Sequence, residues 1–175
     1  LHAEFTAPWS IRSQIAPEDC GSLLEGAEHL VLYHYVAEGR LSVRLPKGEP
    51  FEIAAGEIII FPHNDEHLLG SQLDLTPVPT RDVVCATPEG ELWMIRHGGG
   101  GERTRIVCGF LGCDRFEGNP LASALPPILR FDTRQGNTGA WIRSSLEFAA
   151  DEIAARRAGS EAVLAKMSEL LFVES

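Results

Sequence analysis

The sequence predicts a mostly β domain, a barrel or sandwich of short strands, followed by helices at its C-terminal end. Short apolar or alternating stretches recur at roughly 10-residue intervals in the first half, with Gly and Pro turns between them. A helical apolar pattern follows from Thr138 to Ala158. The 175 residues, 44% hydrophobic and 23% charged, are enough for one sizeable domain or a compact barrel with a helical appendage.

The strands are predicted from alternation and from short buried runs. Residues 40–45 alternate polar and apolar side chains, which indicates a strand with one buried face. Residues 58–61 form an apolar run that Pro62 ends, and residues 70–90, with three prolines, predict a long loop with one short strand. The glycines of 97–101 indicate a flexible hairpin connection, because no phosphate-loop pattern accompanies them. The predicted strands are 30–36, 40–45, 51–53, 58–61, 83–85, 91–96 and 104–109.

The chain after Asp114 is predicted to be helical, beginning with a short helical stretch over Leu121–Phe131. Thr138 is the predicted N-cap of the next helix and Gly159 its stop. A last helix begins at Ser160 and reaches the final residue without a stop signal, so we expect the chain to be part of a longer protein. The predicted lobes are a β-barrel over 1–115 and a helical lobe over 116–175. The predicted inward face of the first long helix is Ile142, Leu146, Ala149 and Ile153.

Composition excludes some classes of function. A formal net charge of −10 argues against a direct grip on DNA, which needs clustered basic side chains. No apolar run approaches the roughly 20 residues of a membrane span, and the first residues lack the pattern of a signal peptide, so we expect a cytoplasmic protein. Four cysteines, at 20, 85, 108 and 113, are too few for a disulfide scaffold, and we expect thiols that are buried or bound to metal.

A turn, an apolar strand and a histidine follow one another in residues 56–67, which read Gly-Glu-Ile-Ile-Ile-Phe-Pro-His-Asn-Asp-Glu-His. Gly56 permits a tight turn, and Pro62 ends the strand without needing a ladder donor. This string resembles the second motif of the cupins, Gly-x5-Pro-x-Gly-x2-His, with Asn64 in place of the family's last glycine. Asparagine also tolerates a left-handed turn. The resemblance implies a cupin barrel, a double-stranded β-helix of the jelly-roll type, before the C-terminal helices.

The ligands that metal-dependent cupins carry in their first motif are missing. Alignment places the family's His, His and Glu positions at Gly26, Glu28 and Leu32. His34 lies on the same strand face as Leu32, but it is not the expected ligand. This departure argues against cupin enzyme chemistry, and it is usual in sugar-binding and regulatory cupins.

A longer series of strings resembles the sensor domain of AraC-family transcription regulators. Their joint order is more specific than any one of them. The resemblance implies an unknown small-molecule effector, a homodimer formed through the terminal helices, and DNA contact only through helix-turn-helix motifs located after Ser175. The strings lie at 7–12, 34–39, 61–67, 98–104, 108–114, 119–121, 125–126 and 169–172.

Two histidines and two cysteines make up the ligand set of a structural zinc site: His63, His67, Cys108 and Cys113. A tetrahedral Cys2His2 site needs this set, and four protein ligands leave no open position for a substrate. We expect the histidines on the loop after the 58–61 strand and at the start of the next strand. The cysteines would lie on a late strand and just past a turn at 109–112.

Each of these residues has a simpler alternative. Cys108 could be a small buried hydrophobe, and the histidines could line a pocket or bond to the backbone. His34 is the reserve zinc ligand. It also belongs, with Trp9, Arg12 and Trp93, to a candidate pocket for a sugar, an acid or an aromatic effector. Trp93 could instead be a core residue, and Arg12 could pair with a surface carboxylate.

The sequence therefore predicts an effector-sensing, dimerising regulator domain that is not an enzyme. Leu164, Met167 and Leu171 share one face of the last predicted helix and would form the two-fold dimer interface. The alternative is a metal-dependent cupin oxygenase or isomerase. Such an enzyme needs open metal positions and usually His or carboxylate ligands rather than thiolates.

Overall fold

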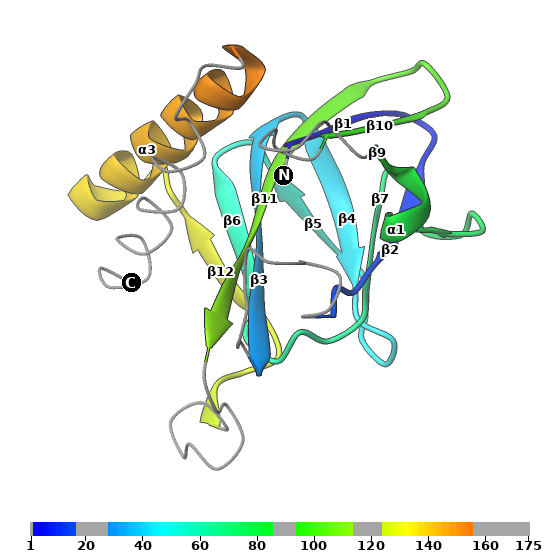
Figure 1. Ribbon diagram of the computed structural model, residues 1–175, viewed down its shortest axis with the longest axis horizontal. Coiled ribbons are helices and arrows are strands. Elements are labelled where there is room, and N and C mark those ends of the chain that lie inside the picture. Colours follow the sequence, from blue (N-terminus) through cyan, green and yellow to red (C-terminus); the bar gives the residue numbers. More distant parts are fainter. Residues whose placement is uncertain (1, 17–27, 86–93, 114–123, 156–175) are drawn as a thin grey trace.

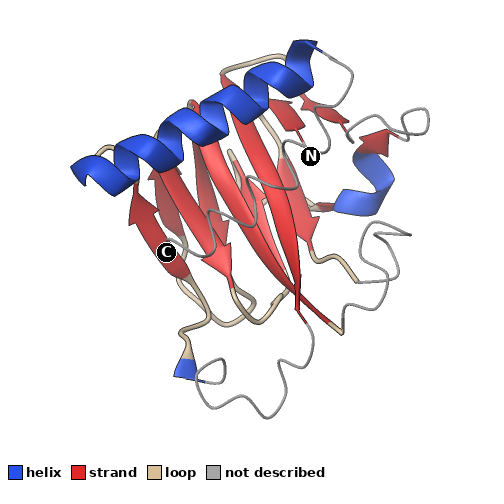
Figure 2. Cartoon of the chain, turned by 60° about the vertical axis from the view of Figure 1, so that its left-hand side comes forward, coloured by secondary structure: helices blue, strands red, loops and turns tan. Residues whose placement is uncertain are grey.

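Two facing β-sheets enclose the core of the protein, and one long helix lies across the outer face of the larger sheet (Figure 1, Figure 2). The computed structural model describes residues 2–16, 28–85, 94–113 and 124–155. The long helix is α3, Gly136–Ala155, and a short helix, α1, spans Thr80–Val83. No helix in the described ranges is long and apolar enough to cross a membrane.

The larger sheet has seven strands and the smaller sheet has five. Neighbouring strands run antiparallel except for two parallel pairs, β1 with β10 and β2 with β8. The larger sheet, in spatial order, is β12 (Leu129–Asp132), β6 (Glu57–Phe61), β3 (His29–Glu38), β11 (Arg103–Cys113), β1 (His2–Thr6), β10 (Met94–Gly98) and β9 (Val84–Cys85). The smaller sheet is β5 (Phe51–Ala54), β4 (Arg40–Arg44), β7 (His67–Gly70), β2 (Ser10–Ser13) and β8 (Val78–Pro79).

The core fills the space between the sheets because alternate residues of each strand point inward. Leu41 and Val43 on β4 are buried, and the residues between and beside them are not. The indole of Trp9 stacks on the ring of Phe5, with centroids 4.0 Å apart. The burial of Leu41 and Val43 confirms the alternation predicted for residues 40–45.

Helix α3 buries its inner face on the larger sheet. Leu146 is 1% exposed and packs in one cluster with Tyr35 and Val107, and Ile142 is half-buried against the same cluster. This confirms the predicted inward face for those two helix residues; Ala149 and Ile153 lie outside the described side chains. The helix begins at Gly136, so Thr138 falls inside it rather than at the predicted N-cap.

The turns on either side of β6 have the predicted backbone. Gly56 has a φ of 87°, and Asn64 has a φ of 53°. Both values lie in the left-handed region, which glycine and asparagine adopt most easily. The replacement of the motif's last glycine by Asn64 therefore keeps the turn that places His67 at the start of β7.

Two predictions of local structure are wrong. Leu121–Phe131 was predicted to be helical, but its last three residues lie in β12, which pairs with the free edge of β6. The predicted turn at 109–112 is instead part of β11, which runs without a break to Cys113. Gly109 is needed there for space, because a Cβ at this position would lie 2.3 Å from the ring of Tyr33.

Other differences concern the extent of the β structure. The predicted long loop at 70–90 contains β8 and α1 as well as the expected short strand, and β1 and β2 were not predicted. The predicted 91–96 strand is observed as β10, and residues 91–93 lie outside the described part. β12 lies past residue 115, where the barrel was predicted to end, so the β structure continues to Asp132. The last predicted helix also lies outside the described residues.

Candidate functional site

Three strands bring two imidazoles and a thiol together inside the barrel. His34 on β3 and Cys108 on β11 are register partners, so their side chains leave the larger sheet on the same face. His67 is the first residue of β7 in the opposite sheet. His34 is 3% exposed and His67 is 1% exposed. The group is therefore held by both walls of the barrel.

The side chains form one continuous series of contacts. Nδ1 of His34 lies 3.0 Å from Sγ of Cys108, and Nε2 of His34 lies 2.9 Å from Nε2 of His67. Nδ1 of His67 lies 2.8 Å from the carbonyl oxygen of Asp65. We call these four groups the thiol–imidazole chain.

The position of each proton follows from the acceptor at the end of the chain. A carbonyl oxygen only accepts, so Nδ1 of His67 donates to Asp65 and Nε2 of its neutral ring accepts. The donor to that nitrogen is Nε2 of His34, which leaves Nδ1 of His34 to accept from the thiol of Cys108. Every member of the chain is satisfied in this arrangement while all three side chains are uncharged.

Burial favours the same uncharged forms. It lowers the pKa of His34 well below its usual value, and the neighbouring His67 lowers it further. Burial lowers the pKa of His67 to about 4, against a smaller opposing effect of the Asp65 carbonyl, and it raises the pKa of Cys108 to about 12. The ring of Phe61 stacks on His67 with centroids 3.6 Å apart and covers one face of the imidazole.

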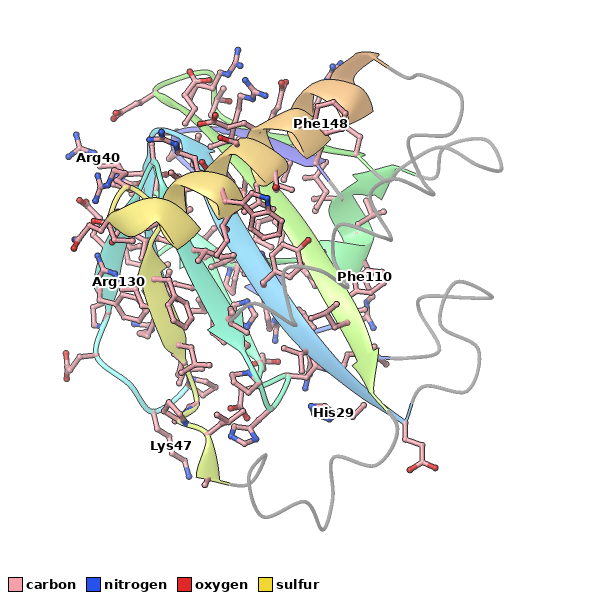
Figure 3. All side chains as sticks on the ribbon, turned by 90° about the vertical axis from the view of Figure 1, so that its left-hand side faces the viewer. His29, Arg40, Lys47, Phe110, Arg130 and Phe148 are labelled. Carbon is pink, nitrogen blue, oxygen red and sulfur yellow. The ribbon has the colours of Figure 1, made fainter. Side chains whose placement is uncertain are left out.

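A small, partly open cavity of about 30 Å³ borders the thiol–imidazole chain. Its wall is mostly apolar, and none of the described residues that line it carries a formal charge; its polar groups include His34, Cys108 and Ser13. The cavity has room for roughly two water molecules. Phe110 on β11, labelled in Figure 3, also lines it.

The predicted zinc ligands do not all belong to the thiol–imidazole chain. His67 and Cys108 belong to it, with His34 between them. Nε2 of His63 instead lies 2.9 Å from the carbonyl oxygen of Leu125. The backbone of Cys113 pairs with His29 at the end of β11, and its side chain lies outside the described part. In the described ranges, no three His, Cys, Asp or Glu side chains are grouped to hold a metal ion.

The predicted pocket residues fall in different places. His34 lines the cavity, while Trp9 is buried behind Phe5, which does line it. Arg12 is exposed and lies in an open groove of about 570 Å³ together with Arg81. Trp93 lies outside the described residues. The groove and the cavity share Ile15 and Thr80 in their walls.

The sequence predicts His34 as a reserve zinc ligand and as a pocket residue, and it does line the cavity, but the sequence does not pair it with Cys108. The pairing depends on the register between β3 and β11, which are far apart in the sequence. An inward-facing histidine in an apolar strand was the available signal, and it names no partner.

Comparison with known families decides the identity of this barrel. A family model described as Cupin matches residues 1–175, which is the whole chain. The chain belongs to the cupin family. No curated protein matches this cupin.

Several solved structures resemble the cupin weakly. They include the protein YhaK from Escherichia coli, with a TM-score of 0.39 and 9% identity over 75% of this chain and 40% of that one. Apo ToxT K231A from Vibrio cholerae strain SCE256 has a TM-score of 0.47 and 9% identity over 95% and 51%. ToxT from Vibrio cholerae O395, bound to (E)-4-(8-methylnaphthalen-1-yl)but-3-enoic acid, has a TM-score of 0.44 and 7% identity over 98% and 53%. This cupin spans about half the length of those proteins, or less.

Proposed function

We propose that this cupin is the effector-sensing and dimerisation domain of an AraC-type transcription regulator, and that it does not act as an enzyme. The observation that carries the proposal is the mostly apolar cavity between the two sheets, bordered by the thiol–imidazole chain. A concave, mostly apolar site with a few convergent polar groups is typical of small-molecule binding. The net charge of −10 favours DNA contact through a separate domain rather than through this one.

Strands β3 and β11 connect the cavity wall to α3, because each strand has one face toward the core and the other toward the helix. His34 and Ile106 face the core, while the next residues along the same strands, Tyr35 and Val107, pack with Leu146 of α3. An effector that moves β3 or β11 would therefore move the surface on which α3 rests. Binding would bias the arrangement of two subunits if its affinity differs between the arrangements.

The lining favours an uncharged effector. A carboxylate or ammonium in the cavity would be buried among groups without formal charge, at a large desolvation cost. Because the cavity has space for only roughly two water molecules, a larger effector must displace a side chain at its edge, such as Ile15 or Phe110. Ile15 also lines the open groove, so its displacement would connect the cavity with that groove.

A thermal-shift screen of small neutral compounds, beginning with indole and cyclic alcohols, tests the proposal. A ligand at about 100 times its Kd adds about 2.7 kcal/mol of stability, which corresponds to a rise in Tm of roughly 5–10 °C for a domain of this size. Ala3→Val, which fills the cavity, should abolish the rise. Glu4→Gln, on the next residue but the other face of β1, should preserve it. A rise that survives Ala3→Val would place binding elsewhere and contradict the proposal.

A structural zinc held by His63, His67, Cys108 and Cys113 remains part of this proposal. The presence of His67 and Cys108 in one thiol–imidazole chain supports it, although His34 would have to leave the position between them. Metal analysis of the purified protein tests it: one zinc per chain, lost in Cys113→Ser and in His63→Ala, is the expected result. Iron or manganese together with turnover would instead favour the alternative cupin enzyme.

A further inference from the structure

The thiol proton of Cys108 lies between its sulfur and Nδ1 of His34, and a metal ion could take the place of this proton. Nδ1 of His34 lies 3.0 Å from the thiol and presents a lone pair to it, because the ring's proton is on Nε2. We propose that Cys108 and His34 bind a soft monovalent cation, Cu(I), between Sγ and Nδ1, with His67 as the positioning residue. The site goes beyond the effector-sensing function. It shares Cys108 with the predicted zinc site but takes His34 as the second ligand, so the two metals are alternatives at this thiol.

The ligand types select a soft ion. Thiolate favours Cu(I) and zinc, while imidazole is a ligand of several transition metals. Magnesium and calcium need oxygen ligands, and no carboxylate is among the described residues that line the adjoining cavity. The choice is therefore between Cu(I) and a divalent soft ion.

Charge decides between these two. One thiolate and one Cu(I) ion add up to zero net charge, and the imidazoles stay neutral. A divalent ion on the same ligands would leave a net positive charge beside an apolar cavity without formal charges in its described lining. An uncompensated buried charge is strongly unfavourable, even after the protein relaxes. Zinc at this place thus requires a second anionic ligand, whereas Cu(I) does not.

The cavity supplies the space that the exchange needs. Metal–sulfur and metal–nitrogen bonds of roughly 2.3 and 2.0 Å put the two ligand atoms roughly 4 Å apart in a near-linear site. The present 3.0 Å contact must therefore open by about 1 Å, and both Cys108 and His34 line the cavity into which they can move. His34 keeps its tautomer, because its Nε2–H still donates to His67.

His67 acts through His34 and does not touch the ion. Its Nδ1–H donates to the Asp65 carbonyl, which fixes Nε2 of His67 as the acceptor that holds the ring of His34. Hydrogen-bond partners of this kind orient ligating histidines, and their loss typically costs 10–100-fold in metal affinity. The exchange is balanced without electron transfer: the S–H bond breaks, an S–Cu bond forms, and one proton leaves for the solvent.

The test is an anaerobic titration of the full chain with Cu(I), in competition with bicinchoninate, and with Ag(I) as a redox-inert substitute. A background variant in which Cys20, Cys85 and Cys113 are serine removes the other thiols. We expect one Cu(I) and one released proton per chain, and an X-ray absorption spectrum with one sulfur and one nitrogen neighbour. No binding by this background, or a copper neighbourhood without nitrogen, would overturn the proposal.

Variants then assign the ligands. Cys108→Ser and Cys108→Ala should abolish the site, and His34→Gln should weaken it by more than 100-fold, beyond the range for an outer partner. His67→Gln should weaken it by about 10–100-fold while the sulfur neighbour persists in the spectrum. His97→Ala, on β10 and outside both the cavity lining and the predicted zinc ligands, is the matched control and should bind as the background does. Binding that survives both Cys108 variants, or that is lost in His97→Ala, would contradict the assignment without bearing on the effector cavity.

Discussion

His34 and His67 face each other across the barrel with their Nε2 atoms 2.9 Å apart. Two ring nitrogens at this distance share a single proton, so one imidazole must donate and the other must accept. The Asp65 carbonyl at the far side of His67 decides which. The backbone carbonyl of Asp65, between β6 and β7, therefore sets the tautomer of His34 in the larger sheet. Through that tautomer it makes the thiol of Cys108 the hydrogen-bond donor to His34.

The buried histidines predict that stability falls in mild acid. The pKa of His67 is lowered from 6.5 to about 4, so between these values the unfolded chain binds a proton that the folded chain does not. The contribution of His67 to the free energy of unfolding should be fully present above about pH 6.5 and be lost as the pH drops toward 4, a loss of up to about 3 kcal/mol. His34 acts in the same direction. Urea unfolding at a series of pH values measures this, and His67→Phe should flatten the slope.

Gly98 is predicted to tolerate no side chain. Its φ is 134°, and a Cβ there would lie 1.9 Å from the carbonyl oxygen of Thr6. Gly100 also has a positive φ, 89°, but a Cβ there would meet nothing within 4 Å. Gly100→Ala should therefore cost only the backbone penalty of about 1–2 kcal/mol, and Gly98→Ala clearly more. If thermal or urea unfolding shows the same loss of stability for both variants, then β1 and β10 do not pack closely at Gly98 and Thr6, and the prediction is wrong.

Glu57 joins the barrel to β12. Its carboxylate accepts two hydrogen bonds from Arg130, the shorter at 2.6 Å, and one from the backbone N–H of Ala54 at 2.8 Å, while the residue is only 7% exposed. Glu57→Gln should cost about 1–3 kcal/mol, because the paired charge and one acceptor are lost. Glu52→Gln, on the exposed face of β5, should change stability by less than about 0.5 kcal/mol. If both variants unfold alike, Glu57 does not anchor the strand.

The predicted dimer interface is tested by a pair of charge variants in the last predicted helix. Met167→Glu places a carboxylate on the Leu164–Leu171 face and should shift the protein from dimer to monomer in sedimentation experiments. Lys166→Glu introduces the same group off that face and should leave the dimer intact. A strictly monomeric parent protein at high micromolar concentration would refute the pairing role outright.

The motif around β6 was readable in advance because its local chemistry agrees with its place in the fold. Gly56 and Asn64 adopt the left-handed turns expected of them, and the apolar run between them is covered on both faces. The inner face of α3 at Ile142 and Leu146 was predictable for the same reason, since its period matches the surface it covers.

Long-range pairing could not be obtained from local patterns. Leu129–Asp132 is a strand because β6 offers it an edge, a tertiary effect that overrides the local preference of residues near two prolines. Gly109 and Gly112 suggested a turn, but β11 pairs with β3 through both residues, and the ring of Tyr33 occupies the space that a side chain at Gly109 would fill. The contact of His34 with Cys108 likewise depends on a register that no sequence spacing specifies.

Nitrogen NMR of the histidine rings at pH 7 tests the thiol–imidazole chain most directly, since it reports which ring nitrogens carry protons. The expected spectrum has His34 protonated on Nε2 only and His67 protonated on Nδ1 only, in agreement with the contacts to His67 and to the Asp65 carbonyl. An imidazolium at either position, or the opposite tautomer at His34, would contradict it.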